Sequence, residues 1–188
     1  MRADIILSGV GGQGILSIAA VIGEAALKEG LYMKQAEVHG MSQRGGSVVT
    51  YVKYGEKVYS PIIDRGEADL ILAFEMLEAM RALPYLKKGG KMIANTQQMN
   101  PMPVITGAME YPEDIQKKLE SKINLQAVDA LKLAGEAGNI KAVNVVLIGL
   151  LAKSMDVDKQ VWLDSIKETV PEKFVEMNLK AFELGYTM

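Results

Sequence analysis

Residues Ala3–Ser17 read ADIILSGVGGQGILS, and this stretch decides how the N-terminal half of the chain folds. The apolar run ADIILS predicts a buried strand that stops at glycine. Apolar residues then recur at helical spacing from Ile15 to Lys28, and Gly30 ends the predicted helix. A strand, a glycine-rich turn and a helix in this order are typical of an α/β fold.

The next segments predict a mixed sheet. LYMKQAEV (31–38) completes a βαβ unit, which we expect to be parallel and right-handed. Only a glycine-rich loop separates it from the predicted strand GSVVTYVKYG (46–55), and a parallel crossover needs about a dozen residues or more. If these two strands are neighbours, the second is therefore expected to be antiparallel to the first. YVKYGEKVYS (51–60) predicts a hairpin that turns at Gly55–Glu56.

The rest of the chain continues as strands and helices. QQMNPMPV (97–104) carries two prolines and predicts a loop or an edge crossing. AVNVVLIGLLAKS (142–154) is apolar on nearly all sides, so we expect it to be deeply buried in the fold or against a partner. The other predicted strands are ADLILAF (68–74), KMIANT (91–96) and LQAVDA (125–130), and the other predicted helices are 75–86, 112–122, 130–137, 158–170 and 171–186.

These elements predict one three-layer α/β/α domain over residues 1–188. Its sheet is mixed but mostly parallel, with a Rossmann-like N-terminal βαβ start and a helical C-terminal part. The length of 188 residues and the apolar fraction of 49% suit a single domain with a sizeable core.

Composition excludes several classes of function. The formal net charge of −2 argues against a nucleic-acid partner bound by bulk electrostatics. The chain has no cysteine, so it cannot form a disulfide or ligate an iron–sulfur cluster through thiolates, and we expect no metal site. We see no signal peptide and no apolar run long enough to span a bilayer, and therefore expect a cytoplasmic protein with no membrane partner. The 12 methionines suit adaptable core packing or a partner surface.

The motif GVGGQG fits G-x-G-x-x-G through Gly9, Gly11 and Gly14, between a predicted strand and a predicted helix. Glycines let backbone approach a phosphate, and the helix start offers free N–H groups. Glu37 lies roughly where a dinucleotide site has its acidic residue, but no helix follows that strand, so NAD or FAD is disfavoured. Contact with another anion and tight strand–helix packing both remain open.

A second glycine-rich loop, HGMSQRGG (39–46), holds the only histidine of the chain. Because the carboxyl ends of parallel strands meet at one edge of a sheet, we expect both loops to face the same crevice. The polar side chains expected there are Gln13, His39, Ser42, Gln43 and Arg44, with Glu75, Asn95 and Thr96 adding to the rim.

Each of these residues also has an ordinary structural interpretation. His39 can be a surface or hydrogen-bonded residue, Arg44 can form a weak surface ion pair, and Gly45–Gly46 can form a bulge. We find no motif for hydrolysis or metal chemistry. The loops therefore suit binding, or completion of a site, rather than independent catalysis.

Together the two loops, GVGGQGI and EVHGMSQRGGSV, resemble the gamma-type domain of the 2-oxoacid:ferredoxin oxidoreductase family. VYSPII, EADLILAFEMLEAMRALPYL, AVNVVLIGLLA and NLKAFELGY extend the likeness over nearly the whole chain, and the HGMSQRGG form is similar to the beta subunits of the indolepyruvate branch. Gamma subunits of the pyruvate, 2-ketoisovalerate or 2-oxoglutarate enzymes remain an alternative, as does a stand-alone nucleotide- or coenzyme A-binding module.

The resemblance implies a subunit of an enzyme that oxidatively decarboxylates aryl pyruvates such as indole-3-pyruvate, forms the acyl-coenzyme A and reduces ferredoxin. Thiamine diphosphate, Mg and iron–sulfur clusters are implied on a large alpha subunit, with no cofactor bound by this chain alone. The motif match assigns cofactor-binding positions, without individual roles, and leaves the catalytic residues unknown. These positions are Gly9, Gly11, Gly12, Gln13, Gly14, His39, Gly40, Ser42, Gln43, Arg44, Gly45 and Gly46.

Overall fold

The computed structural model describes residues 2–42 and 44–188. Its strands are β1 (Arg2–Val10), β2 (Tyr32–His39), β3 (Ser47–Gly55), β4 (Ala68–Ala73), β5 (Leu86–Asn95) and β6 (Asn124–Val128). Its α-helices are α1 (Ile15–Lys28), α2 (Met76–Ala82), α3 (Met102–Ile105), α4 (Ile115–Glu120), α5 (Ala130–Ala137), α6 (Val143–Lys153), α7 (Lys159–Thr169) and α8 (Val175–Thr187). Short 3₁₀ turns are η1 (Leu83–Tyr85), η2 (Ile140–Ala142) and η3 (Glu172–Phe174).

The strands form a six-stranded sheet in the order β2-β3-β1-β4-β5-β6. β1, β4, β5 and β6 pair in parallel, whereas β3 is antiparallel to both of its neighbours, β1 and β2. The sheet is therefore mixed and mostly parallel, as the sequence predicts.

The predicted βαβ unit is split by β3. β2 runs in the direction of β1, and β3 is antiparallel to β2 as expected, but β3 lies between them and pairs with β1 from Arg2↔Gly55 to Val10↔Ser47. Side-chain character explains this order. β3 buries Val48 and Val52 in the core, whereas β2 has largely exposed side chains and suits the edge of the sheet.

The predicted hairpin at Gly55–Glu56 is wrong. β3 ends at Gly55, and residues 56–67 form a loop without a strand that leads to β4, on the other side of β1. Ile63 is buried in the core and Lys53 Nζ donates to the Ile62 carbonyl oxygen at 2.9 Å, so both fix this loop. Residues 56–60 alternate in polarity but cannot pair with β3, because β1 and β2 already occupy both of its edges.

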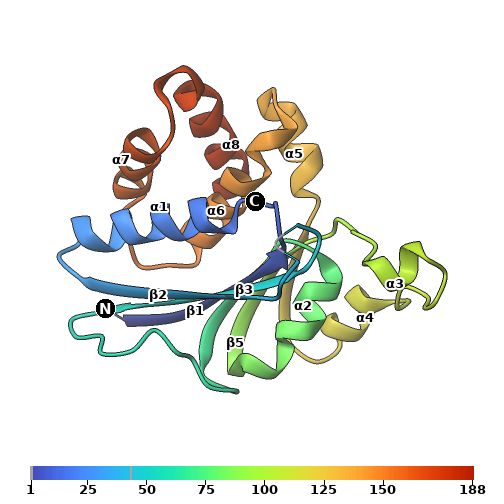
Figure 1. Ribbon diagram of the computed structural model, residues 1–188. Helices are drawn as coiled ribbons and strands as arrows, with labels where there is room; N and C mark the ends of the chain where they lie inside the picture. Colours follow the sequence, from blue (N-terminus) through green and yellow to red (C-terminus); the bar gives the residue numbers. More distant parts are fainter. Residues whose placement is uncertain (1, 43) are drawn as a thin grey trace.

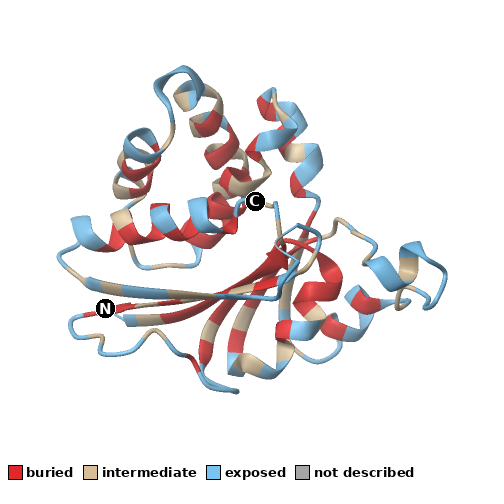
Figure 2. Ribbon diagram, in the orientation of Figure 1, coloured by how far each residue is buried: buried red, intermediate tan, exposed pale blue. Residues whose placement is uncertain are grey.

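Helices cover the two faces of the sheet (Figure 1). α1, α5, α6, α7 and α8 pack on one face around the larger apolar core, and α2 and α4 pack on the other face around a second core. α6 is buried over nearly its full length, as predicted from its sequence, whereas β2 is mostly exposed (Figure 2). The three-layer α/β/α arrangement is thereby confirmed.

Several predicted boundaries were wrong. The predicted helix 75–86 ends at Ala82, since η1 carries a proline and Leu86 already begins β5. The predicted helix 112–122 is limited to α4, because Asp114 has a φ of 56° and interrupts helical geometry before it. The proline-rich segment 97–104 contains part of α3, which extends away from the body of the fold (Figure 1). The predicted bounds of α1 and α5 are confirmed.

No helix within the described residues combines the length and the apolar character needed to cross a bilayer.

Candidate functional site

The two glycine-rich loops hydrogen-bond to each other through their backbones. Gly11 N–H donates to the Gly46 carbonyl oxygen at 2.8 Å, and Gly45 N–H donates to the Gly11 carbonyl oxygen at 3.1 Å. These bonds extend the β1–β3 ladder beyond its last strand pair, Val10↔Ser47. The structure therefore brings the loops together at the carboxyl edge of β1, as the strand directions predict.

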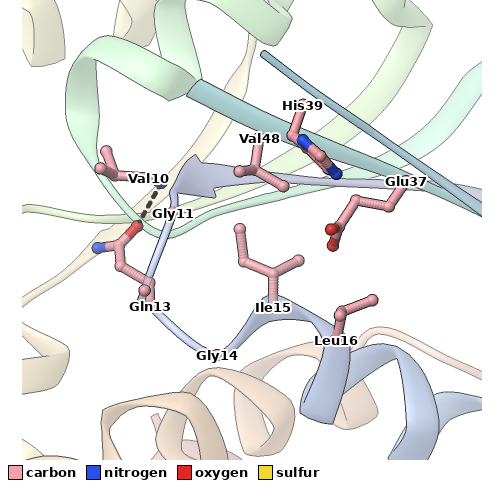
Figure 3. Close-up of a pocket in the computed structure, with 10 residues that line it drawn as sticks. Val10, Gly11, Gln13, Gly14, Ile15, Leu16, Glu37, His39 and Val48 are labelled. Atoms are coloured by element: carbon pink, nitrogen blue, oxygen red, sulfur yellow. Dashed lines mark hydrogen bonds between the residues drawn. The ribbon is translucent and has the colours of Figure 1, made fainter. Parts of the chain in front are cut away.

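A cavity of about 500 Å³ lies beside this junction (Figure 3). The first turn of α1 forms one wall, and the carboxyl end of β2 forms the opposite wall. The cavity is lined by Val10, Gly11, Gly12, Gln13, Gly14, Ile15, Leu16, Glu37, His39 and Val48. Its lining combines backbone, apolar side chains and two ionisable side chains.

Four backbone N–H groups at the start of α1 are unpaired within the described part of the chain. Gly12, Gly14, Ile15 and Leu16 line the cavity, and none of their N–H groups has an acceptor among the described residues. Gly14 caps the helix at a φ of 75° and offers no side-chain oxygen to them. The positive end of the helix dipole adds to these donors, so this wall suits an anionic group.

The opposite wall carries Glu37 and His39, which lie on the face of β2 that looks toward α1 (Figure 3). Glu37 Oε2 accepts a hydrogen bond from the Thr50 hydroxyl at 3.3 Å. His39 Nδ1 lies 2.9 Å from the Gly40 carbonyl oxygen, and since a carbonyl only accepts, Nδ1 donates and Nε2 is left as an acceptor in the neutral ring. This wall therefore accepts hydrogen bonds, whereas the α1 wall donates them.

The cavity includes only part of the predicted set. Gly11, Gly12, Gln13, Gly14 and His39 line it. The predicted positions outside its lining are Gly9, which is buried beneath the loop, and Gly40, Ser42, Arg44, Gly45 and Gly46. Gln43 lies outside the described residues. Sequence reasoning missed Val10, Ile15, Leu16 and Val48. Among these, Leu16 alone carries a signal in the sequence, because it is apolar yet lies off the apolar face of the α1 helix. The structure leaves it 53% exposed.

Gln13 lines the cavity, but its amide is bonded elsewhere. Gln13 Oε1 accepts from Val10 N–H at 2.7 Å, and Gln13 Nε2 donates to the Phe74 carbonyl oxygen at 3.2 Å. Figure 3 shows the side chain directed toward Val10 and away from Glu37 and His39.

The three residues expected at the rim do not line this cavity. Glu75 is buried and caps α2; its carboxylate accepts from Glu78 N–H at 3.0 Å, Met99 N–H at 3.1 Å and the Tyr111 hydroxyl at 2.5 Å. Burial, and then the bond to Glu75, raise the pKa of Tyr111 above the usual range of a phenol. Glu75 therefore holds the two ends of the segment that carries α3.

Asn95 is also buried, and Thr96 lines a different cavity beside α4. Asn95 Nδ2 donates to the Phe74 carbonyl oxygen at 3.3 Å, and Asn95 Oδ1 accepts from Ala130 N–H at 3.2 Å. This amide joins the ends of β4 and β5 to the start of α5, and Asn95 does not line the cavity beside the glycine loops.

The donor set of this chain does not fit a metal cluster. Across residues 2–42 and 44–188 there is no group of three His, Cys, Asp or Glu side chains placed to hold a metal ion. The absence of cysteine from the whole sequence leaves no thiolate for an iron–sulfur cluster.

Comparison with known proteins gives a consistent result. Residues 4–188 match the profile of the family described as pyruvate ferredoxin/flavodoxin oxidoreductase. The chain is 46% identical to the indolepyruvate oxidoreductase subunit IorB of Pyrococcus horikoshii, over 97% of this chain and 93% of that protein. It is 28% identical to the common gamma subunit of the pyruvate/ketoisovalerate oxidoreductases of Thermococcus kodakarensis, over 97% of this chain and 95% of that protein.

A solved structure shares the fold. The gamma subunit of a keto/oxoacid ferredoxin oxidoreductase from Geobacter sulfurreducens superposes with a TM-score of 0.74 at 24% identity, covering 98% of this chain and 96% of that one.

Proposed function

Because the chain belongs to the pyruvate ferredoxin/flavodoxin oxidoreductase family, we propose that it is a non-autonomous subunit of an indolepyruvate:ferredoxin oxidoreductase. The observation that carries this proposal is the 46% identity to an IorB subunit over almost the full length of both chains. The lower identity of 28% to a pyruvate/ketoisovalerate gamma subunit places that alternative second.

The chemistry of the chain supports a subunit rather than a complete enzyme. The reaction oxidatively decarboxylates an aryl 2-oxoacid, forms an acyl-coenzyme A and reduces ferredoxin. Thiamine diphosphate, when bound, supplies the decarboxylation chemistry, and iron–sulfur clusters carry the electrons. The chain has no cysteine for a cluster, and its described residues include no group of three side chains placed to hold the Mg ion that accompanies thiamine diphosphate, so we assign both cofactors to a larger, cysteine-containing partner.

We propose that this chain contributes a wall to the site at which coenzyme A is bound. Support comes from the unpaired N–H groups at the start of α1, which suit a phosphate, and from the 500 Å³ cavity beside them. Glu37 and His39 face these donors and suit hydroxyl or amide groups of the same ligand.

Arg44 is proposed as a second anion contact, because its guanidinium is exposed and forms no ion pair with any described residue. It lies outside the cavity lining, on the loop that hydrogen-bonds to the glycine turn. A planar guanidinium suits either a phosphate or a substrate carboxylate.

Co-expression with the partner subunit tests the function. We expect a stable complex that reduces ferredoxin with indole-3-pyruvate and coenzyme A. Failure to form a complex, or activity with pyruvate, 2-ketoisovalerate or 2-oxoglutarate but not with indole-3-pyruvate, would contradict the assignment.

Arg44→Ala separates a contact role from a bracing role in that complex. An anion contact predicts a KM for coenzyme A or the 2-oxoacid that rises about 10-fold or more, which matches the loss of one charge-assisted hydrogen bond. A purely bracing loop predicts weaker assembly with unchanged coenzyme A dependence. Arg65→Ala is the matched control, because Arg65 is an exposed arginine in the loop before β4 and therefore lies near the amino ends of the parallel strands.

A further inference from the structure

The amide of Gln13 occupies the place where an open α/β sheet ordinarily admits its ligand. β1 and β4 are parallel neighbours, and α1 and α2 leave their carboxyl ends toward opposite faces. Ligands bind in the crevice that such a divergence opens. Here Gln13 bridges that crevice by accepting from Val10 at the end of β1 and donating to Phe74 just after β4.

Gly9 makes this placement possible. A Cβ atom at Gly9 would lie 2.7 Å from Gln13 Oε1 and 2.9 Å from Phe74 Cβ, closer than real Cβ contacts allow. Gly9 is buried and does not line the cavity. The absence of a side chain at Gly9 therefore makes room for the Gln13 amide, together with Phe74 and Ile15, whose Cδ1 would lie 2.9 Å from the added Cβ; Gly9 itself does not face the cavity.

Gln13 lies within the turn that carries the unpaired donors. Its own N–H donates to the Val10 carbonyl oxygen at 3.1 Å, so backbone and side chain together hold the turn at both ends of residues 10–13. The N–H groups without an acceptor among the described residues belong to cavity-lining residues on either side of it, from Gly12 to Leu16.

We propose that Gln13 is a positioning residue, which fixes the glycine turn so that its N–H groups face the cavity, and that it does not itself contact the ligand. This role differs from the cofactor contact that the motif match assigns to it. The expected effect on the KM for coenzyme A rests on the proposed function, whereas the expected effect on the conformation of the glycine turn does not.

Gln13→Met tests the proposal, because methionine fills similar space and makes neither hydrogen bond. In the full chain without ligand, amide hydrogen exchange should accelerate about 5- to 100-fold at Val10, Gly11 and Gln13, whose N–H groups are hydrogen-bonded in the wild-type turn; this is the range expected from losing two neutral hydrogen bonds. Gln116→Met, on the exposed face of α4, is the control and should leave these amides unchanged. Unchanged exchange in Gln13→Met would overturn the inference.

Gly9→Ala gives an independent check. Its Cβ should displace the Gln13 amide, so it should accelerate exchange of the same amides, and the double variant should be no faster than the faster single variant. Additive effects would contradict a shared role. If Gly9→Ala does not fold, the exchange result for Gln13→Met still decides the question.

The reconstituted complex supplies the functional readout. Gln13→Met should raise the KM for coenzyme A about 5- to 100-fold with kcat within about twofold. A wild-type complex without activity would refute the proposed function and leave the exchange experiment intact. An active complex in which Gln13→Met keeps the wild-type KM would refute the inference alone.

Discussion

Gly46→Ala is expected to separate the two glycine loops. A Cβ at Gly46 would overlap the Ser42 carbonyl oxygen and lie 3.3 Å from Ser42 Cβ. The overlapping atom is backbone, so no rotamer change can remove the clash, and the loop must move. That movement breaks the two backbone bonds between Gly11 and residues 45–46.

The magnitude follows from those bonds. Each backbone hydrogen bond contributes a net ~0.5–1.5 kcal/mol, so the loss of both should lower the free energy of unfolding by about 1–3 kcal/mol. For a chain of this length, a loss of that size corresponds to a fall in Tm of roughly 2–12 °C.

Gly40→Ala is the matched control in the same loop. No atom lies within 4 Å of its Cβ position, and its φ does not fall in the left-handed region. Its free energy of unfolding should stay within about 1 kcal/mol of wild type. Urea and thermal unfolding of the three proteins measure the difference. If Gly46→Ala unfolds at the wild-type midpoint, or Gly40→Ala loses as much stability, the close packing of this loop is not what holds the junction.

Three further predictions concern the surrounding fold. Gly185→Ala, in α8, places a Cβ against a backbone oxygen of α6 and should lower the free energy of unfolding in urea by about 3 kcal/mol. Gly135→Ala, with open space in α5, should raise it by about 0.5–1 kcal/mol. Equal effects of the two substitutions would contradict the close contact between α8 and α6. Burial raises the pKa of Tyr54 to about 12, so the folded state favours the neutral phenol. The contribution of this group to the free energy of unfolding should be complete below pH 10 and should fall toward pH 12. Tyr54→Phe should flatten this fall, and identical pH profiles of the two proteins would refute ionisation of Tyr54 as its cause. Ser47→Ala removes the 2.6 Å hydrogen bond to buried Glu78 and should cost about 1–3 kcal/mol; a Tm within 1 °C of wild type would contradict it.

Local periodicity and loop length predicted most of the fold. The α1 helix, the buried α6 helix and the antiparallel relation of β2 and β3 follow from them, because each depends on nearby residues. The position of β3 between β1 and β2 could not be predicted, since partner choice depends on which strand tolerates exposure at an edge. The false hairpin at Gly55 has the same origin, because alternation alone does not show whether a second strand has a free neighbour.

The candidate site was predicted in outline. Strand direction placed both glycine loops at one edge, and their backbone bonds agree with that expectation. The roles of individual side chains were not predictable from a motif. Glu75 and Asn95 are polar residues at the ends of strands, yet buried backbone donors and carbonyls engage them. Apolar lining such as Ile15 carries no sequence signature that separates it from the core.

The insertion of β3 also constrains the order in which the chain can assemble. β2 and β3 are joined by one short loop, so their pairing closes little chain and should form early. β1 leaves the ribosome first, yet both of its partners, β3 and β4, follow only after α1 and β2. An apolar strand with two late partners stays unpaired during synthesis, and such an edge is prone to misassociation. The glycine junction that closes the candidate site therefore depends on β3 reaching its place between β1 and β2.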